Sequence, residues 1–387
     1  MRSSLILSAL VAVVVGFGGS VAVVIAAAEA VSASAEQTAS WVAVLCISMA
    51  VGSFALSVYS RMPIVLAWST PGAALIATST SVDMAQAVGA FLAAGALIVL
   101  TGLIRPLGDL AGRIPTPIAT ALLAGVLFDF VAGAVRDSVS LPLLGAPMVA
   151  AFLLVRLWSP SWAVIASILV GVAVALGRGM HAEFPALELT RLVTVAPAFD
   201  GAALLGLALP LFIVTMASQN LPGIAVLRAD GYAPPVSPIL TGTGLLSILT
   251  APFCGHTTSL AAITAAICTG PDAHPDPAER WKGGAVYATG YAVLAAVAAS
   301  VVAVAQSFPA ELIAILAGLA LLGPFMGSLR AAMGGSGDPF APAVTFVVTA
   351  SGVSILSVGA PFWGLVAGLV AMSLPQLSRS LRASRAR

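Results

Sequence analysis

The chain is poor in charge: of its 387 residues only 8% are Asp, Glu, Lys or Arg, whereas 60% are hydrophobic. Soluble domains carry about a quarter charged residues, so this composition excludes a water-soluble globule. The longest polar stretches, residues 178–200, 271–283 and 328–340, are too short to form a soluble domain. The formal net charge of +1, without a basic patch in the sequence, gives no indication of a nucleic-acid partner.

Cysteine is scarce as well, with three residues in the chain. Cys46, Cys254 and Cys268 all lie in or beside apolar runs. A buried cysteine usually behaves as a small hydrophobic side chain, so we predict no disulfide and no metal site. We also expect no cofactor. A signal peptide is disfavoured too, because the apolar run over residues 5–28 is longer than a signal-peptide core and further apolar runs follow it.

Long apolar runs are what the chain has in abundance. A helix that crosses a bilayer needs ~20 mostly apolar residues. Polar breaks divide the sequence into about fourteen such segments, and we therefore predict an all-α polytopic membrane protein in a lipid bilayer. The segments lie near residues 5–28, 40–59, 63–80, 85–104, 115–134, 142–156, 161–177, 201–221, 237–250, 254–270, 284–304, 310–328, 341–355 and 359–376. Within the first, Gly18, Gly19 and Ser20 either let the backbone come close or are ordinary helix-packing positions, and we favour the packing interpretation.

Positively charged residues orient these segments, because cytoplasmic loops carry an excess of Lys and Arg. With the N-terminus in the cytoplasm, alternate assignment of the loops places three arginines outside, Arg136, Arg178 and Arg191. Thirteen basic residues fall inside: Arg2, Arg61, Arg105, Arg113, Arg156, Arg228, Arg280, Lys282, Arg330, Arg379, Arg382, Arg385 and Arg387. This bias predicts fourteen spans with both termini in the cytoplasm, and we expect the protein in the bacterial inner membrane.

One predicted segment, RMPIVLAWSTPGAALIATSTS, contains a break in its backbone. Pro71 and Gly72 interrupt an otherwise apolar run. Proline is favoured in the first turn of a helix and is costly inside one. Ser69 or Thr70 suits the N-cap position just before it. We therefore predict an extended strand over residues 64–68, followed by a half-helix that starts near Pro71.

A second segment, APFCGHTTSLAAITAAICTG, is broken in a similar way. Pro252 and Gly255 interrupt the backbone there. Thr257 or Thr258 can serve as an N-cap, so we predict that a short helix follows directly after them.

The two breaks correspond in position, in the third and the tenth predicted segments. A shift of seven is odd, so the second half of the chain enters the membrane upside down. We therefore predict two inverted repeats, residues 1–193 and 194–387, with short strands in both broken segments; two kinked packing helices are the alternative. Aligning the breaks pairs Trp68 with His256, Ser69 with Thr257, Thr70 with Thr258 and Pro71 with Ser259.

Half-helices that meet at the membrane centre direct their free N–H groups toward it, which is an anion-binding arrangement. One helix terminus contributes ~0.3–2 kcal/mol. Desolvating a carboxylate costs several kcal/mol, so the termini alone are not sufficient. Direct hydrogen bonds must supply the difference, and we expect them from backbone N–H groups and from the hydroxyls of Ser69, Thr70, Thr257 and Thr258.

Other polar side chains at membrane depth are functional candidates by default. Gln219 and Asn220, at the end of the eighth segment, contact either the substrate or a neighbouring helix. His256 is either a proton carrier, since histidine titrates near neutral pH, or a neutral hydrogen-bonded brace for the strand. Asp129 is either a proton carrier or an acid near the outer water interface.

Five stretches together resemble the benzoate:proton symporter family: ASWVAVLCISMAVGS, RMPIVLAWSTPGAAL, RIPTPIATALLAGVLF, SQNLPGIAVLRADGY and PFCGHTTSLAAITAAICTGPDAHPDPAERW. The resemblance covers nearly the whole chain, and AWSTPGAAL and SQNLPG carry its specificity. That family is similar in architecture to the nucleobase transporters, which have seven-plus-seven inverted repeats. The resemblance implies a core domain of segments 1–4 and 8–11, a gate domain of segments 5–7 and 12–14, and a substrate site between them at the broken segments.

The chain departs from the nucleobase transporters in its acidic residues. Those proteins usually carry glutamates in the eighth and tenth segments. Here Gln219 lies about where the first would be, and GHTTSLAAITAAI has no carboxylate. The ring N–H groups of uracil or xanthine need carboxylate acceptors, whereas a nearby carboxylate repels an anion. The departure therefore favours an anionic substrate.

We predict a secondary active transporter, not an enzyme, that imports benzoate or a related aromatic carboxylate with protons. Moving an anion inward against an inside-negative potential costs ~2.3 kcal/mol per 100 mV, so at least one cation must accompany it. The predicted substrate site comprises Trp68, Ser69, Thr70, Pro71, Gly72, Gln219, Asn220, His256, Thr257, Thr258 and Ser259.

Two alternatives stay open from the sequence. One is a transporter of the same fold for another small organic anion or a nucleobase-like substrate. The other is a serine hydrolase that would use Ser259 and His256, although no third orienting group is evident. The oligomeric state is open as well, with a homodimer as one arrangement.

Overall fold

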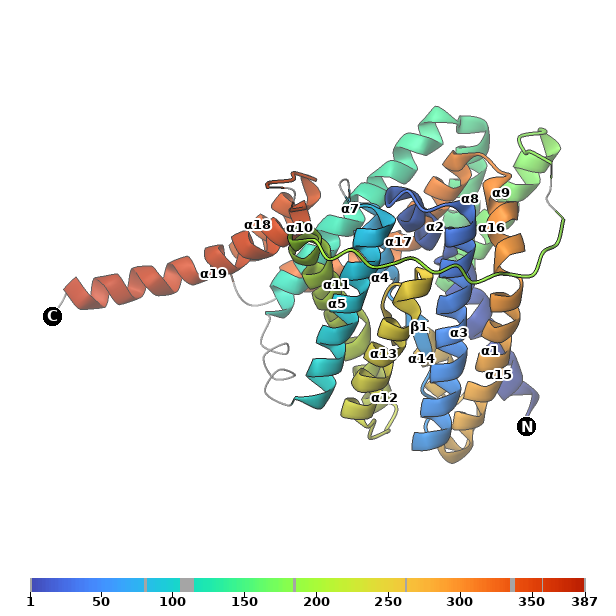
Figure 1. The fold of residues 1–387 in the computed structure, drawn as a ribbon, viewed down its shortest axis with the longest axis horizontal. Coiled ribbons are helices and arrows are strands. Elements are labelled where there is room, and N and C mark those ends of the chain that lie inside the picture. The colour runs from blue at the N-terminus through green and yellow to red at the C-terminus, as the bar shows by residue number, and fades with distance from the viewer. Residues whose placement is uncertain are drawn as a thin grey trace.

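The computed structural model describes residues 2–79, 82–104, 115–183, 186–261, 263–334, 338–356 and 358–385. Within these ranges the chain is mostly helical, and its helices pack side by side around one short pair of strands (Figure 1). Up to residue 177 the elements are α1 (Ser3–Gly18), α2 (Val21–Ala30), α3 (Ala35–Ser60), β1 (Leu66–Trp68), α4 (Thr70–Ala77), α5 (Met84–Leu103), α7 (Thr116–Ser140), α8 (Pro142–Arg156) and α9 (Pro160–Gly177). From residue 201 onward they are α10 (Gly201–Ala203), the π-helical turn η1 (Leu204–Ala208), α11 (Leu209–Thr215), the π-helical turn η2 (Met216–Asn220), α12 (Leu221–Ala229), α13 (Val236–Thr250), the 3-10 turn η3 (Ala251–Phe253), β2 (Thr258–Leu260), α14 (Ile263–Thr269), the 3-10 turn η4 (Pro277–Lys282), α15 (Gly283–Ala296), α16 (Ala298–Gln306), α17 (Ala310–Met333), α18 (Phe340–Ala350) and α19 (Ala360–Arg385).

Seven helical segments in the described ranges are long and apolar enough to cross a membrane: Ser3–Ala30, Ala35–Ser60, Met84–Leu103, Thr116–Ser140, Gly201–Ala229, Val236–Phe253 and Ala310–Met333. An eighth results if Pro277–Ala296 and Ala298–Gln306, bent by 58° at their junction, count as one span. Shorter apolar helices cover Pro142–Arg156, Trp162–Gly177, Phe340–Ala350 and Ala360–Leu374. The prediction of a helical, polytopic membrane protein is confirmed, while about fourteen crossings stay a prediction. The arginines Arg105, Arg113 and Arg387, used above to orient the chain, lie outside the described residues.

Two of the long helices begin with a reciprocal capping arrangement that the sequence encodes. At the start of α3, the backbone N–H of Gln37 donates to Ser34 Oγ at 3.2 Å, and the backbone N–H of Ser34 donates to Gln37 Oε1 at 2.8 Å. Asp83 and Gln86 form the same pair of bonds at the start of α5. Each pair satisfies donors that a helix N-terminus leaves free, so both helices begin at a defined residue.

The two strands lie inside the bundle, antiparallel to each other. Leu66 pairs with Leu260, Ala67 with Ser259 and Trp68 with Thr258. The half-helix α4 begins at Thr70, directly after β1, and Ser69 is its N-cap. The predicted strand and half-helix in this segment are therefore confirmed, because Pro71 sits in the first helical turn, where its missing N–H costs nothing.

The second break differs from the prediction. Thr257 and Thr258 do not cap a helix: Thr258 begins β2, and α14 starts only at Ile263. An antiparallel pair has a local two-fold axis at its centre, here between Ala67 and Ser259. About that axis Ser69 corresponds to Ala261, four residues beyond the Thr257 of the sequence alignment. The alignment matched the hydroxyl residues, but strand pairing rather than capping sets the register.

Backbone groups along the outer edge of β1 form hydrogen bonds with side chains of neighbouring helices. The backbone N–H of Leu66 donates to Ser53 Oγ at 2.9 Å, and the Tyr287 hydroxyl donates to the Leu66 carbonyl at 2.7 Å. Ser57 Oγ donates to the Ile64 carbonyl at 2.8 Å. Backbone groups that find no partner are costly away from water. These polar side chains on α3 and α15 therefore allow a two-stranded sheet to exist within an apolar bundle.

The outer edge of β2 is covered in the same manner. The backbone N–H of Thr258 donates to Ser247 Oγ on α13 at 2.9 Å. The backbone N–H of Leu260 donates to Asn220 Oδ1 at 2.8 Å. Asn220 thereby joins the eighth predicted segment to the strand that belongs to the tenth.

Close helix contacts at glycine hold the bundle around the strands. A Cβ on Gly244 of α13 would lie 2.7 Å from the backbone nitrogen of Val99 on α5. A Cβ on Gly318 of α17 would lie 2.3 Å from the carbonyl oxygen of Phe130 on α7. Only glycine allows these backbones to approach so closely, which is a common way to pack helices in membranes.

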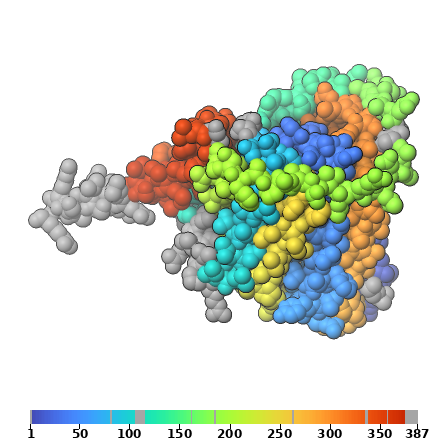
Figure 2. All heavy atoms as spheres, in the orientation of Figure 1, coloured from blue at the N-terminus to red at the C-terminus, as the bar shows by residue number. Residues whose placement is uncertain are grey.

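Residues 186–200, which precede α10, run without helix or strand across one face of the molecule, as a green band over α3, α13 and α5 in Figures 1 and 2. The backbone N–H groups of Val193, Val195 and Ala198 donate to Ser40 Oγ, the Pro252 carbonyl and the Ala85 carbonyl, respectively. These bonds bind the stretch to the helices that surround the strand pair.

Candidate functional site

A cavity of about 540 Å³ lies beside the strand pair. This volume is within the ~300–1,000 Å³ typical of small-molecule sites. One part of its wall comes from the elements around the strands and includes Gly16, Gly19, Ser20, Ala67, Trp68, Thr70, Pro71, Ala217, Ser218, Gln219 and Tyr291. The other part comes from α7, α8, α9 and α17 and includes Thr120, Leu123, Phe152, Arg156, Val164, Leu319, Pro324 and Ser328. We refer to it as the central cavity.

The N-terminus of α4 reaches this cavity through Thr70 and Pro71. Ser69 Oγ accepts from the backbone N–H of Gly72 at 3.1 Å, and the N–H of Ala73 donates to the Ser69 carbonyl at 2.7 Å. Pro71 has no N–H. Among the described residues, the Thr70 N–H and hydroxyl therefore have no hydrogen-bond partner, and they are the groups that α4 offers to a ligand.

Most of the other predicted hydroxyls are used within the protein. Thr215 Oγ1 donates to Ser69 Oγ and also lies 2.9 Å from Thr257 Oγ1. Thr258 Oγ1 lies 2.7 Å from Ser48 Oγ, and Ser259 Oγ donates to the Ala67 carbonyl at 3.2 Å. Ser69, Gly72, Thr257, Thr258 and Ser259 are all buried and do not line the central cavity. The hydroxyls among them thus connect α3, α11 and the strands.

His256 is held at both ring nitrogens. The indole Nε1 of Trp41 donates to Nδ1 at 2.9 Å, and Nε2 lies 3.0 Å from the Ser69 carbonyl oxygen. An indole N–H is only a donor, so Nδ1 must be unprotonated and Nε2 must carry the hydrogen. A doubly protonated ring would place two N–H groups against each other. The geometry therefore matches the neutral brace. A serine hydrolase would need Nε2 to face the hydroxyl of Ser259, whereas Nε2 faces the Ser69 carbonyl instead.

Gln219 and Asn220 separate into different roles. Gln219 is half-buried and lines the central cavity, whereas Asn220 is fully buried and bonds to β2. Both lie in η2, where the N–H of Leu221 donates to the Met216 carbonyl, five residues back. Pro222 follows and cannot donate, which favours such a π-helical turn. The wider turn presents Gln219 toward the cavity while Asn220 faces the strand.

The aromatic part of the wall depends on the junction of α1 and α2. Trp68 Nε1 donates to Ser20 Oγ at 2.9 Å, and Ser20 Oγ donates to the Gly16 carbonyl at 2.6 Å. The Trp68 ring makes an edge contact with Tyr291, with ring centres 6.5 Å apart. Ser20 and its glycine neighbours were predicted to be packing positions, and Tyr291 was not among the predicted site residues. The run Gly18-Gly19-Ser20 was the feature of the sequence that could have indicated this part of the wall, because α1 ends there and Ser20 bonds to Trp68 of the broken segment.

Charge in the central cavity is of one sign. Arg156 is its one charged side chain among the described residues, and no carboxylate or histidine lines it there. Arg156 was not among the residues predicted for the substrate site, and its charge entered only the predicted orientation of the chain. Nothing in the sequence indicated that the last residue of α8 would reach the cavity, because tertiary packing decides that.

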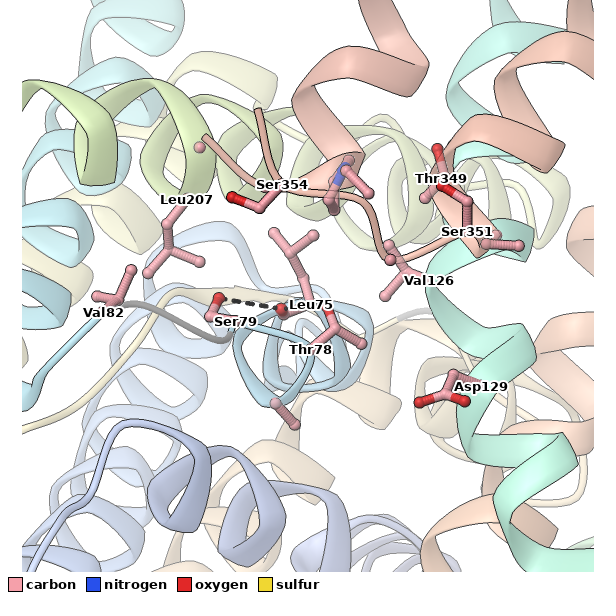
Figure 3. Close-up of a pocket in the computed structure, with 18 of the residues that line it drawn as sticks. Leu75, Thr78, Ser79, Val82, Val126, Asp129, Leu207, Thr349, Ser351 and Ser354 are labelled. Carbon is pink, nitrogen blue, oxygen red and sulfur yellow. Dashed lines mark hydrogen bonds between the residues drawn. The ribbon is translucent and has the colours of Figure 1, made fainter. Parts of the chain in front are cut away.

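Asp129 lies at a different cavity of about 360 Å³, shown in Figure 3. It projects from α7 near Thr78 at the C-terminal end of α4, and its carboxylate receives a 2.6 Å hydrogen bond from Arg136. Both side chains of this ion pair are about two-thirds exposed. The half-helix α4 therefore touches the central cavity with its first turn and this second cavity with its last.

The family model and the relatives that match this chain are all membrane proteins. The family model described as Benzoate membrane transport protein matches residues 1–374. The chain is 38% identical over 365 residues to the inner membrane protein YdcO of Escherichia coli, covering 94% of this chain and 93% of that one. It is 34% identical over 362 residues to the benzoate membrane transport protein of Acinetobacter baylyi, covering 93% and 92% of the two chains.

Solved structures share the fold at low sequence identity. The transmembrane domain of the cyanobacterial bicarbonate transporter BicA superposes with a TM-score of 0.58 at 14% identity, covering 95% of this chain and 98% of that one. The overall structure of SLC26A9 gives a TM-score of 0.64 at 13% identity, covering 95% of this chain and 65% of that one.

Proposed function

Because this chain belongs to the benzoate membrane transport protein family, it is a membrane transporter, and we propose that it carries benzoate or a related aromatic carboxylate across the inner membrane with protons. The observation that carries the proposal is the chemistry of the central cavity. Rings of Trp68, Tyr291 and Phe152 line it, together with the free N–H and hydroxyl of Thr70. An apolar ring and an anionic or neutral carboxyl group both find partners there.

The absence of a lining carboxylate among the described residues supports an acid over a nucleobase. Nucleobase N–H groups need acceptors, and Gln219 supplies only one amide oxygen. A buried carboxylate would repel a substrate carboxylate strongly in a medium of low dielectric constant. The relative from Acinetobacter baylyi is itself named a benzoate transport protein, which agrees with this choice.

We propose that transport uses two inverted repeats with a core and a gate, in about fourteen crossings. The antiparallel pairing of β1 with β2 supports the repeat, since such a pair has a local two-fold axis. The position of α4, with one end at each cavity, supports access from alternate sides of the membrane. The bias of basic residues supports cytoplasmic termini. A homodimer is part of the proposal, and the mass of the detergent-solubilised protein tests it.

We further propose that the substrate itself carries the proton. His256 is held neutral by two hydrogen bonds, and Asp129 lies at the other cavity. Protonating a carboxylic acid with a pKa near that of glutamate costs about 4 kcal/mol at pH 7. Desolvating the ion costs several kcal/mol, which is a comparable amount. Crossing as the neutral acid therefore needs no titrating side chain, and the net movement is electroneutral.

Uptake of labelled benzoate into proteoliposomes tests the function. We expect accumulation when the outside is acidic, and its loss when a protonophore collapses the gradient. Unlabelled benzoate and other aromatic acids should compete, whereas bicarbonate and uracil should not. Accumulation driven by sodium, or competition by uracil alone, would contradict the assignment.

A further inference from the structure

Arg156 is the one charged side chain that lines the central cavity in the described part of the chain. It is the last residue of α8 and is half-buried. Among the described residues it has neither an ion-pair partner nor a hydrogen-bond acceptor for its five N–H donors. A guanidinium that is partly removed from water and left without acceptors is suited to an anionic ligand, which it can bind through two parallel bonds.

An aromatic side chain accompanies this guanidinium. The Cζ atom of Arg156 lies 5.9 Å from the ring centre of Phe152, one helical turn earlier on α8. Phe152 is buried and lines the same cavity, as do the aliphatic side chains of Leu123 and Val164. A charged donor beside an apolar wall complements both halves of an aromatic carboxylate.

This pair comes from the C-terminal end of α8 and not from the elements around the strands. Leu157 and Trp158, which follow Arg156, are more than three-quarters exposed. Pro160, the first residue of α9, and Ala331, near the end of α17, also line the cavity. These residues lie at or just beyond the ends of α8, α9 and α17, whereas Trp68 belongs to β1 and Thr70 follows that strand closely.

We propose that Arg156 and Phe152 form a second substrate subsite at the mouth of the central cavity, which holds the aromatic carboxylate before it reaches α4. The inference rests on the proposed function, because it assigns the same class of substrate to both positions. Arg156 receives the carboxylate as an anion, and Phe152 contacts the ring. The subsite gives the cavity a place for the charged acid, whereas the Thr70 end receives the acid after it has lost water and gained its proton.

Variants of Arg156 test the charge. Arg156→Gln should raise the half-saturation concentration for benzoate by about tenfold, since it removes a charge-assisted pair of bonds. Arg156→Lys should restore part of the loss. Arg228→Gln is the matched control: Arg228 lies in the last turn of α12, is exposed and does not line the cavity. Its half-saturation concentration should equal that of the parent protein.

Chemical rescue separates charge from folding. Cys46, Cys254 and Cys268 are buried, so Arg156→Cys introduces one accessible thiol among the cysteines of the chain. Labelling it with a cationic trimethylammonium-ethyl methanethiosulfonate should recover affinity, and the anionic sulfonatoethyl reagent should not. Benzoate should slow the labelling. Equal effects of both reagents would overturn the proposal, because a purely structural role does not depend on the sign of the charge.

Phe152 is tested by the choice of acid. Phe152→Leu should weaken the binding of benzoate more than the binding of cyclohexanecarboxylate, whereas Arg156→Gln should weaken the binding of both acids equally. If the parent protein binds no carboxylate of the panel, the proposed function and the subsite both fail. If the parent binds benzoate while Arg156→Gln and Arg228→Gln match it, only the subsite is wrong.

Discussion

The indole Nε1 of Trp41 donates a 2.9 Å hydrogen bond to Nδ1 of His256, and this pairing decides which nitrogen of the histidine carries its hydrogen. The other nitrogen lies 3.0 Å from the carbonyl of Ser69, the N-cap of α4. The histidine therefore connects α3 to the start of the half-helix at the central cavity. This geometry supports the interpretation of His256 as a neutral brace that positions α4.

The first prediction follows from this pairing. A glutamine at position 256 has an amide N–H to donate to Ser69 and an oxygen to accept from Trp41. We expect His256→Gln to keep accumulation of benzoate driven by a proton gradient. His256→Leu should lower the free energy of unfolding by about 1–3 kcal/mol, because the buried Trp41 N–H loses its acceptor. Uptake into proteoliposomes and thermal unfolding in detergent measure the two effects.

Two outcomes for the His256 variants would contradict this role. If His256→Gln lets benzoate equilibrate across the membrane but not accumulate, the histidine carries the proton after all. A loss of folding in both variants would instead show that the cavity around position 256 accepts only an imidazole ring.

The second prediction separates Gln219 from Asn220. Gln219 lines the cavity, so Gln219→Ala should raise the half-saturation concentration for benzoate and leave thermal stability near that of the parent protein. Asn220→Ala should destabilise the fold by about 1–3 kcal/mol, since the backbone N–H of Leu260 loses its acceptor. Each variant is the control for the other. The assignment of these two amides is wrong if Asn220→Ala unfolds like the parent.

The third prediction concerns the space beside Tyr291. A Cβ on Gly16 would lie 2.8 Å from the Tyr291 hydroxyl oxygen, so Gly16→Ala must displace that ring in the cavity wall. Such crowding costs ~1–3 kcal/mol, and we expect at least a fivefold weaker affinity for benzoate by calorimetry. Gly177→Ala is the control, because a Cβ there meets nothing within 4 Å. Equal affinities for both variants would show that Tyr291 does not contact the ligand.

The fourth prediction concerns Asp129. Its ion pair with Arg136 is largely exposed, and pairs of this kind contribute only about 0.2–1 kcal/mol. Asp129→Asn should therefore leave both thermal stability and proton-driven accumulation close to those of the parent. Accumulation that disappears while exchange of benzoate for benzoate continues would identify Asp129 as the proton carrier.

Local patterns in the sequence were sufficient for the first broken segment. Ser69 precedes Pro71, and these residue types favour an N-cap followed by a first helical turn wherever they occur. The structure has that cap and that helix start. The apolar runs likewise identified the long spans, because a bilayer demands a minimum length of apolar helix regardless of the neighbours.

The second broken segment required tertiary information. Thr257 and Thr258 satisfy the same local rule for a cap, yet Thr257 directly precedes β2 and Thr258 is its first residue. Their backbone and hydroxyl groups bond to Ser247, Ser48 and Thr215, which come from other parts of the chain. A threonine hydroxyl bonds equally well to a helix start or to a distant side chain, so the local sequence does not distinguish the two.

The sequence by itself determined the class of the protein, its apolar spans and the half-helix beginning at Thr70, because these depend on composition and on interactions between near neighbours. Only the tertiary structure decided which polar side chains face the central cavity. It turned Gln219 and Arg156 toward the cavity and Asn220 and His256 toward the strands. The physical reason is that a buried polar group must find a partner, and that partner is chosen by packing between elements that are far apart in the chain.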